Sequence, residues 1–256
     1  MNILAVGDIV GKTGIDELKQ KLPKIIEENH VDFVIVNGEN AADGMGLWEK
    51  QYREILSLNV DCVTMGNHTW KKKDIFNFID DAQIVRPANY PKNTPGKGCR
   101  IFEKNGKKIA VINLIGRVTM GELPEDPFLE VREIVNRVKN TVDIIIVDFH
   151  GEATAEKIAM GYYLDGDVTI VYGTHTHVQT GDEEILPKGT AYITDIGMTG
   201  PKHSVIGMDI DVSFKRFTTA FPEKYRMAEG PGKINSVMFT VNNETNKVTE
   251  IKRINM

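Results

Sequence analysis

The stretch "NILAVGDIVGKTG" (residues 2–14) decides the fold class of this chain, because it places an apolar run directly before a polar loop and a helical pattern. Residues 2–7 are apolar and β-branched and predict a buried strand, whereas residues 13–29 predict an amphipathic helix. A strand, a short loop and a helix in succession are typical of a layered α/β fold.

The loop itself resembles a phosphate-binding P-loop only superficially. A P-loop has four residues between its first glycine and the Gly-Lys pair, so that successive N–H groups curl around a phosphate. Here the spacer between Gly7 and Gly11 is one residue short, and it begins with the carboxylate of Asp8. Asp8 therefore needs a positive partner. Lys12 and Thr13 are expected to begin the following helix, with a phosphate contact from the helix N-terminus as the alternative.

Apolar runs alternate with helical patterns along most of the remaining chain. Further strands are predicted at 32–38, 61–66, 107–116, 142–149 and 167–173, and helices at 48–58, 129–139 and 153–161. Near the C-terminus, 189–197 and 235–254 have the alternation of strands and hairpins, with "NNETN" as a turn. No linker or repeat interrupts the pattern. We therefore expect one domain over residues 1–256, built as a sandwich of sheets with helices outside.

Composition narrows the class of protein. The chain has 256 residues, 41% hydrophobic and 26% charged, which suffices for one large core. A net charge of -5 argues against a protein that coats nucleic acid but allows a small nucleotide substrate. Two cysteines, Cys62 and Cys99, make no disulfide framework and suit a reducing compartment. No leader and no apolar run of about 20 residues is present, so we expect a cytoplasmic protein without membrane contact.

Polar side chains follow the predicted strands at the points where the strands end. Because ligands gather at the carboxyl edge of open α/β sheets, these side chains are the candidate site. They are Asp8, Glu39, Asn40, Asn67, His68, His150, His175 and His177, and they include four of the six histidines. Five strand ends that carry metal-competent side chains are hard to explain by core packing, which would favour apolar residues there.

Each of these signals alone has an ordinary structural explanation. Asp8 could cap the following helix, Glu39-Asn40 could form a turn, "GNH" at 66–68 could expose its histidine, and His150 could be a hydrogen-bonded core residue. The "GTHTH" motif at 173–177 is more specific, because alternate residues of an extended segment share a face and offer two imidazoles to one site. The combination favours a metal centre.

Five motifs together resemble those of calcineurin-like metallophosphoesterases. These are "GD" at 7–8, "GEN" at 38–40, "GNH" at 66–68, the lone His150 and "GTHTH" at 173–177. The resemblance implies a four-layer α-β-β-α sandwich of two mixed sheets flanked by helices. Two departures, Val10 in place of a histidine and Glu39 in place of an aspartate, are similar to the YmdB-like branch. That branch implies a dinuclear-metal phosphodiesterase acting on 2′,3′-cyclic nucleotides.

Two divalent ions a few ångströms apart need a bridging carboxylate, and Glu39 is the candidate. By analogy with the family, Asp8, Glu39, Asn40 and His177 would hold the first ion, and Glu39, Asn67, His150 and His175 the second. Asn40 would replace the missing histidine. A shell of oxygen and nitrogen without thiolate suits Fe or Mn, with Zn as an alternative.

The expected chemistry is attack of a metal-bridging hydroxide on phosphorus, in line with the departing alkoxide. His68 is the candidate proton donor to that alkoxide, because it neighbours a ligand yet is not needed as one. The alternative role for His68 is to orient the water or the substrate. Rival functions are a phosphomonoesterase, a P-loop switch, and a metal-binding regulatory protein that acts through a partner.

Substrate choice is less clear from the sequence. The segments 116–128 and 197–209 are predicted as long loops near the site. Lys202 and His203 could contact phosphate, although a solvated loop is the simpler interpretation. The segment 212–227 mixes apolar and basic residues and suits either a homo-oligomer contact or a lid.

Overall fold

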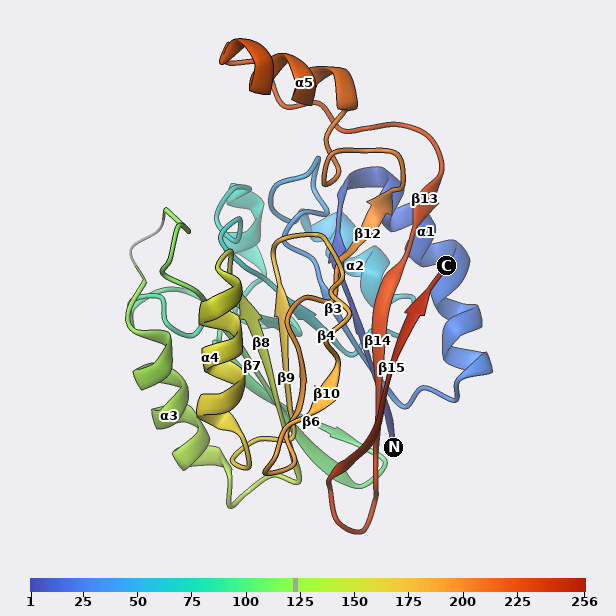
Figure 1. The fold of residues 1–256 in the computed structure, drawn as a ribbon. Helices are drawn as coiled ribbons and strands as arrows, with labels where there is room; N and C mark the ends of the chain where they lie inside the picture. The colour runs from blue at the N-terminus through green and yellow to red at the C-terminus, as the bar shows by residue number, and fades with distance from the viewer. Residues whose placement is uncertain (122–123) are drawn as a thin grey trace.

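The computed structural model describes residues 1–121 and 124–256, and its framework is a pair of six-stranded sheets that face each other (Figure 1). The first sheet has the strand order β15-β14-β1-β3-β4-β5. Its strands are β1 (Asn2–Val6), β3 (Phe33–Asn37), β4 (Cys62–Thr64), β5 (Ile84–Val85), β14 (Asn235–Val241) and β15 (Val248–Asn255). Strands β1, β3, β4 and β5 are parallel, β14 pairs antiparallel with β1, and β15 pairs antiparallel with β14.

The second sheet has the strand order β10-β11-β9-β8-β7-β6. Its strands are β6 (Cys99–Lys104), β7 (Lys107–Ile115), β8 (Ile144–His150), β9 (Ile170–Thr174), β10 (Glu184–Ile185) and β11 (Ala191–Ile193). The central strands β7, β8, β9 and β11 are parallel, and β6 and β10 form antiparallel edges. Both sheets are therefore mixed, and the carboxyl ends of their parallel strands lie where the candidate residues occur.

Helices cover the outer face of each sheet. The covering helices are α1 (Gly11–Glu28), α2 (Glu49–Leu56), α3 (Pro127–Val138) and α4 (Thr154–Leu164). A fifth helix, α5 (Ile210–Thr219), lies away from the sheets, and a 3-10 turn, η1, spans Lys73–Asn77. Leu18 and Leu22 of α1 join one buried cluster with Leu4 of β1. Val131 of α3 and Met160 of α4 join another cluster that includes the outer face of β7 and β8. The helix predicted at 13–29 thus begins two residues earlier, at Gly11.

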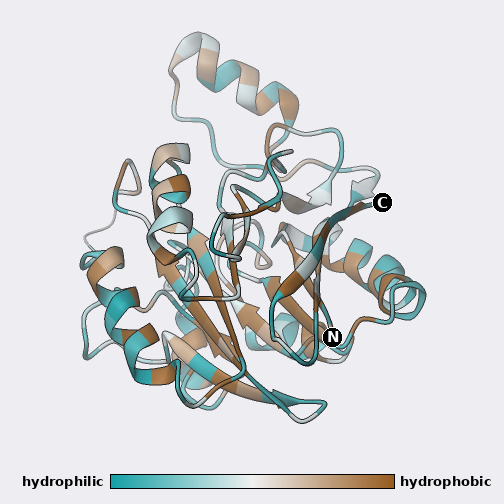
Figure 2. Ribbon diagram, turned by 60° about the horizontal axis from the view of Figure 1, so that its bottom comes forward, coloured by the Kyte–Doolittle hydropathy of each residue, from teal (hydrophilic) through white to brown (hydrophobic). Residues whose placement is uncertain are grey.

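A third cluster fills the space between the two sheets. Ile3 and Phe33 of the first sheet share it with Ile146 and Tyr172 of the second. The ring of Tyr172 stacks on Phe239 with centroids 6.4 Å apart. Strands in the middle of the molecule are mostly brown and the covering helices have a teal face in Figure 2, as expected when strands are buried on both sides. The predicted four-layer α-β-β-α class is confirmed.

A small sheet lies beside the main layers and was not predicted. It joins β2 (Asp8–Ile9), β12 (Met198–Pro201) and β13 (Gly232–Lys233), so part of the expected loop 197–209 is a strand. Strand β12 forms because Met198 pairs with Asp8, which is far away in the sequence, and a local sequence pattern does not reveal such pairing. The segment 212–227 begins inside α5, which projects from the body (Figure 1). Of the 116–128 loop, residues 122 and 123 lie outside the described residues.

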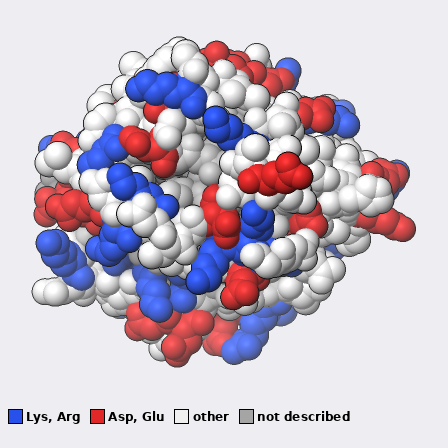
Figure 3. Space-filling view, turned by 90° about the horizontal axis from the view of Figure 1, so that it is seen from below, with Lys and Arg blue, Asp and Glu red and all other residues white. Residues whose placement is uncertain are grey.

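In the described residues, no helix combines the length and the apolar character that a membrane crossing requires. On the face seen from below, Lys and Arg side chains are interspersed with Asp and Glu side chains (Figure 3).

Candidate metal centre

The candidate residues follow the carboxyl ends of strands from both sheets. Glu39 and Asn40 follow β3, Asn67 and His68 follow β4, His150 ends β8, and His175 and His177 follow β9, while Asp8 lies in β2 just after β1. The two sheets face each other, so these ends converge on one place. Asp8, Glu39 and His150 are completely buried there.

One group of ligand atoms surrounds Nε2 of His150. This nitrogen lies 2.9 Å from Oδ1 of Asn67 and 3.1 Å from Oε1 of Glu39. It also lies 3.1 Å from Nδ1 of His175. Within the described residues, Glu39, His150 and His175 form the group of metal-competent side chains, with ligand atoms within 4.8 Å of one another. The structure thus brings together the four residues assigned to the second ion.

Of the residues assigned to the first ion, Asn40 and His177 are in direct contact, and Asp8 contacts the backbone of the loop that carries His177. Oδ2 of Asp8 accepts a hydrogen bond from the backbone N–H of His175 at 3.1 Å. Nδ2 of Asn40 lies 3.1 Å from Nε2 of His177, and Oδ1 of Asn40 lies 2.6 Å from Nδ1 of His68. The amide nitrogen of Asn40, rather than its oxygen, therefore faces His177 in this structure.

Two histidine side chains are held so that one ring nitrogen faces inward. Nδ1 of His177 is 2.9 Å from the backbone oxygen of Ile206, which can only accept, so His177 donates this hydrogen bond. Nε2 of His175 is 3.1 Å from the carboxylate of Glu152. Fixing one nitrogen as a donor leaves the lone pair on the other, as metal-ligating histidines require.

Sequence reasoning missed Glu152 and Ile206. Glu152 lies two residues after His150, and this proximity was the only available signal for it. Ile206 contributes a backbone oxygen, which residue type cannot reveal. Its position in the 197–209 segment places that segment against the centre, whereas the side chains of Lys202 and His203 are exposed.

Burial and the coupling between carboxylates and imidazoles shift the pKa values of the centre in both directions. Burial raises the pKa of Asp8 well above its usual range. Burial would also raise the pKa of Glu39, but the imidazoles of His150 and His68 outweigh it and hold that pKa well below the usual value. For His150, burial would lower the pKa, yet the carboxylates of Glu39 and Asp8 raise it to about 9. Burial and the neighbouring His150 lower the pKa of His175 to about 3.

These residues fit a bound cation. Oδ1 of Asp8 and Oε1 of Glu39 are buried oxygens that accept no well-aligned hydrogen bond in the described part of the chain, and Oε1 of Glu39 instead faces Nε2 of His150 at 3.1 Å. Leaving a buried carboxylate oxygen unsatisfied is costly, and a metal ion would satisfy both. The donor set of carboxylates, an asparagine oxygen and imidazoles suits divalent transition metals.

Gly66 makes the close approach of these groups sterically feasible. A Cβ atom at this position would lie 2.4 Å from Oε2 of Glu39 and 2.4 Å from Nε2 of His150. Any side chain there would occupy the space of the ligand cluster. The glycine of "GNH" is therefore needed for close packing.

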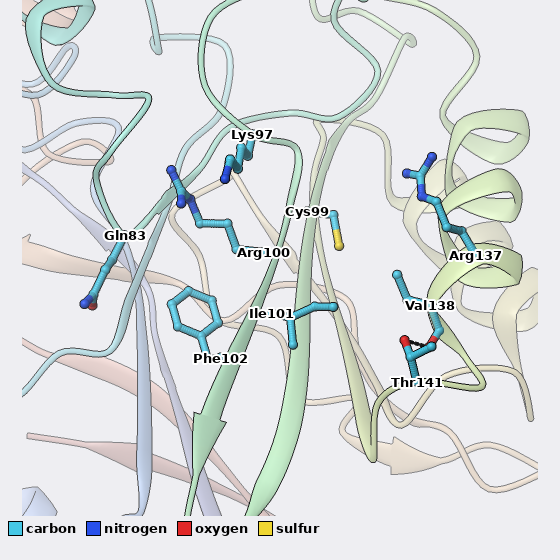
Figure 4. Close-up of a pocket in the computed structure, with 9 residues that line it drawn as sticks. All are labelled: Gln83, Lys97, Cys99, Arg100, Ile101, Phe102, Arg137, Val138 and Thr141. Atoms are coloured by element: carbon cyan, nitrogen blue, oxygen red, sulfur yellow. Dashed lines mark hydrogen bonds between the residues drawn. The ribbon is translucent and has the colours of Figure 1, made fainter.

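A cavity of about 620 Å³ lies elsewhere, at the β6 edge (Figure 4). Its lining includes Cys99, Arg100 and Arg137, and none of the candidate ligands. Arg100 is already engaged there with the backbone oxygens of Ile84 and Asp80. This cavity is separate from the candidate metal centre.

Comparison with known proteins decides the family. The family model of YmdB-like proteins matches residues 4–254. The chain belongs to the YmdB-like family. The YmdB-like chain is 49% identical over 255 residues to the 2′,3′-cyclic-nucleotide 2′-phosphodiesterase of Bacillus subtilis (strain 168), covering 99% of this chain and 96% of that protein. The resemblance predicted from the motifs is confirmed.

Solved structures agree with this assignment. A Mycoplasma pneumoniae protein described as a novel phosphatase matches the YmdB-like chain with a TM-score of 0.94 at 38% identity, covering 100% of this chain and 93% of that one. A 5′-nucleotidase precursor from Thermus thermophilus matches with a TM-score of 0.57 at 12% identity, covering 100% of this chain and 54% of that one, and shows the fold alone. The near relatives are thus named as a phosphodiesterase and a phosphatase, consistent with the predicted class of phosphoric diester hydrolase.

Proposed function

We propose that residues 1–256 act as one metallophosphoesterase domain that hydrolyses 2′,3′-cyclic nucleotides or related small phosphodiesters. The observation that carries the proposal is the burial of Asp8 and Glu39, each with an oxygen that accepts no well-aligned hydrogen bond in the described part of the chain, beside His150 and His175. The printed name of the Bacillus subtilis relative supports the substrate class.

Two ions would be held by overlapping sets of side chains, with Glu39 shared between them. The first set is Asp8, Glu39, Asn40 and His177, and the second is Glu39, Asn67, His150 and His175. Asn40 would join through Oδ1, which requires its amide to present the oxygen rather than the nitrogen to His177. Fe or Mn suits these ligands best, with Zn as an alternative. When bound, the ions would supply Lewis acidity that activates water and stabilises negative charge on phosphoryl oxygens.

We assign to His68 the donation of a proton to the leaving group. Its backbone N–H donates to Oε2 of Glu39 at 2.9 Å, which fixes the residue beside the centre. Its Nδ1 lies 2.6 Å from the side-chain amide of Asn40. Once that amide is turned so that Oδ1 faces the ion, Nδ2 donates to Nδ1 of His68, and the imidazole proton lies on Nε2. The side chain is 23% exposed, and we assign its Nε2–H to the substrate side. From there it can donate a proton to a ribose alkoxide as the phosphodiester opens.

A phosphomonoesterase is the second candidate function, because the Mycoplasma pneumoniae structure is described as a phosphatase. Both candidates use the same metal centre. They differ in the substrate that is turned over, so a substrate comparison separates them.

The deciding experiment assays 2′,3′-cyclic AMP, 3′,5′-cyclic AMP, bis-p-nitrophenyl phosphate and p-nitrophenyl phosphate side by side with Mn²⁺-loaded protein. We expect the 2′,3′-cyclic diester to be turned over fastest. Monoester hydrolysis far above all diester hydrolysis would establish the second candidate instead.

Metal analysis of the same preparation tests the centre itself. We expect close to two ions per chain in the wild type. Glu39→Gln should bind fewer, because the bridging charge serves both sites. The matched control is Glu103→Gln at an exposed position of β6, which should bind as the wild type does.

A further inference from the structure

The threonines of the "GTHTH" motif are not explained by the proposed ligand sets. Thr174 and Thr176 alternate with His175 and His177, and they offer the metals no ligand in either set. Each hydroxyl bonds a carboxylate that is completely buried: Thr174 bonds Asp148, and Thr176 bonds Asp195. These carboxylates lie outside both proposed ligand sets.

Thr174 connects Asp148 to His150. Its hydroxyl donates to Oδ1 of Asp148 at 2.7 Å. Since a hydroxyl has one proton, the 2.9 Å contact with Nδ1 of His150 is donated by the imidazole. Nε2 of His150 thereby keeps its orientation toward Glu39 and His175. His150 and Thr174 also face each other in the β8–β9 register, which fixes the distance between them.

Thr176 connects the loop between the two histidines to Asp195. Both its backbone N–H and its hydroxyl donate to Oδ2 of Asp195, at 3.1 and 2.7 Å. Lys157 of α4 lies 2.6 Å from the same oxygen and is only 1% exposed, so it neutralises the buried charge. Oδ1 of Asp195 accepts a further bond from the N–H of Gly197 at 2.8 Å.

The loop needs such an anchor because its backbone is strained. His175 has a φ of 99° and His177 a φ of 64°, both in the left-handed region that non-glycine residues avoid. A residue in such a conformation costs on the order of 1–3 kcal/mol and persists only where its surroundings enforce it. Thr176 lies between the two, so the bonds to Asp195 restrain both histidines.

We propose that Thr174 and Thr176 are positioning residues, which tie the candidate ligand histidines to Asp148 and to the Lys157–Asp195 ion pair. The inference rests on the metal centre proposed above and adds the residues that give it its shape. Removing either hydroxyl should weaken metal binding, because the imidazoles lose their fixed orientation.

Thr190 provides a control for ordinary loss of stability. It is also completely buried, and its hydroxyl donates to the backbone oxygen of Val168 at 2.7 Å, with no bond to the centre. A Thr190→Val variant therefore loses a buried hydroxyl of the same kind without touching the candidate ligands.

The experiment compares Thr174→Val, Thr176→Val, the two corresponding serine variants and Thr190→Val. Each protein is stripped of metal, its melting temperature is measured, and Mn²⁺ is titrated by calorimetry. We expect the two site valine variants to bind Mn²⁺ about 10- to 100-fold more weakly, the range found when supporting partners of metal ligands are removed. The serine variants, which keep the hydroxyl, should bind about as tightly as the wild type. Thr190→Val should melt lower and bind normally.

Normal Mn²⁺ affinity in both site valine variants would overturn the inference, as would an equal loss of affinity in Thr190→Val. If a valine variant does not fold, the alanine variant at that position takes its place, with Thr190→Ala as its control. Failure of the wild type to bind Mn²⁺ or Fe²⁺ would instead refute the metal centre, and is thereby distinguished from failure of the positioning role.

Discussion

Stability of the metal-free protein should fall as the pH rises, because one proton is held between His150 and Glu39. The pKa of His150 is raised from 6.5 to about 9, with the carboxylates of Glu39 and Asp8 outweighing the effect of burial. A raised folded-state pKa gives stabilisation that is fully present below pH 6.5 and is lost as the pH rises toward 9. At about 1.4 kcal/mol for each pKa unit, the loss is about 3 kcal/mol.

Glu39→Gln isolates this effect. Glutamine keeps an oxygen that can accept the 2.9 Å bond from the N–H of His68, but it removes the charge 3.1 Å from Nε2 of His150. The pKa of His150 should therefore fall, since burial then dominates. The raised pKa of Asp8 acts in the same direction as that of His150 and is present in both proteins. The lowered pKa of His175 acts below pH 6.5, outside the window.

The assay is urea unfolding in EDTA at intervals between pH 6.5 and 9. We expect the free energy of unfolding of the wild type to fall by about 3 kcal/mol and that of Glu39→Gln by less than about 1 kcal/mol. Glu103→Gln, which removes an exposed charge of β6, should follow the wild type. Parallel pH profiles for wild type and Glu39→Gln would refute the idea that Glu39 holds the proton on His150.

Two further predictions concern the centre. His68→Ala should keep both metals and slow turnover of a 2′,3′-cyclic nucleotide by about 10²- to 10⁴-fold, with a smaller defect on p-nitrophenyl esters. His150→Ala should instead lose metal first. An equal defect on both substrates would make His68 an orienting residue. Gly66→Ala should fold but lose metal, because its Cβ atom would lie 2.4 Å from Glu39 and His150. Gly181→Ala should bind metal normally, because its Cβ atom would come no closer than 3.6 Å to Arg253. Metal analysis with circular dichroism checks both variants, and full metal content in Gly66→Ala would contradict the steric argument.

The parts of the fold that could be predicted are those where burial controls the pattern. β3 and β8 are buried along their entire length, and their continuous apolar runs predicted them within two residues. β6 was missed, because it is an edge strand whose side chains are only half-buried or exposed. α5 was missed for a related reason: only Ser213 of this helix is buried, whereas Phe217 is 83% exposed, so packing leaves no readable pattern.

The candidate site likewise has residues that could be predicted from the sequence and residues that could not. Residues at strand ends could be named from the sequence because parallel strands bring their ends to one edge, and the structure brings the four residues of the second set into contact. Their roles as ligands and proton donor stay predictions. The supporting residues Asp148, Lys157 and Asp195 could not be found, because what they contact depends on how β8, α4 and the chain after β11 meet in three dimensions.

Gly66 and Gly173 stand one or two positions before candidate ligands, and both are required for a steric reason. A Cβ atom on Gly173 would lie 1.9 Å from the backbone oxygen of Thr194, next to Asp195. A Cβ atom on Gly66 would enter the ligand cluster itself. Neither glycine has a left-handed φ, so neither is there for backbone freedom. Both glycines allow neighbouring strand ends to approach closely enough for the candidate ligands to surround one site. The residues with a left-handed φ at this site are His175 and His177, and the bonds from Thr176 to Asp195 restrain their backbone.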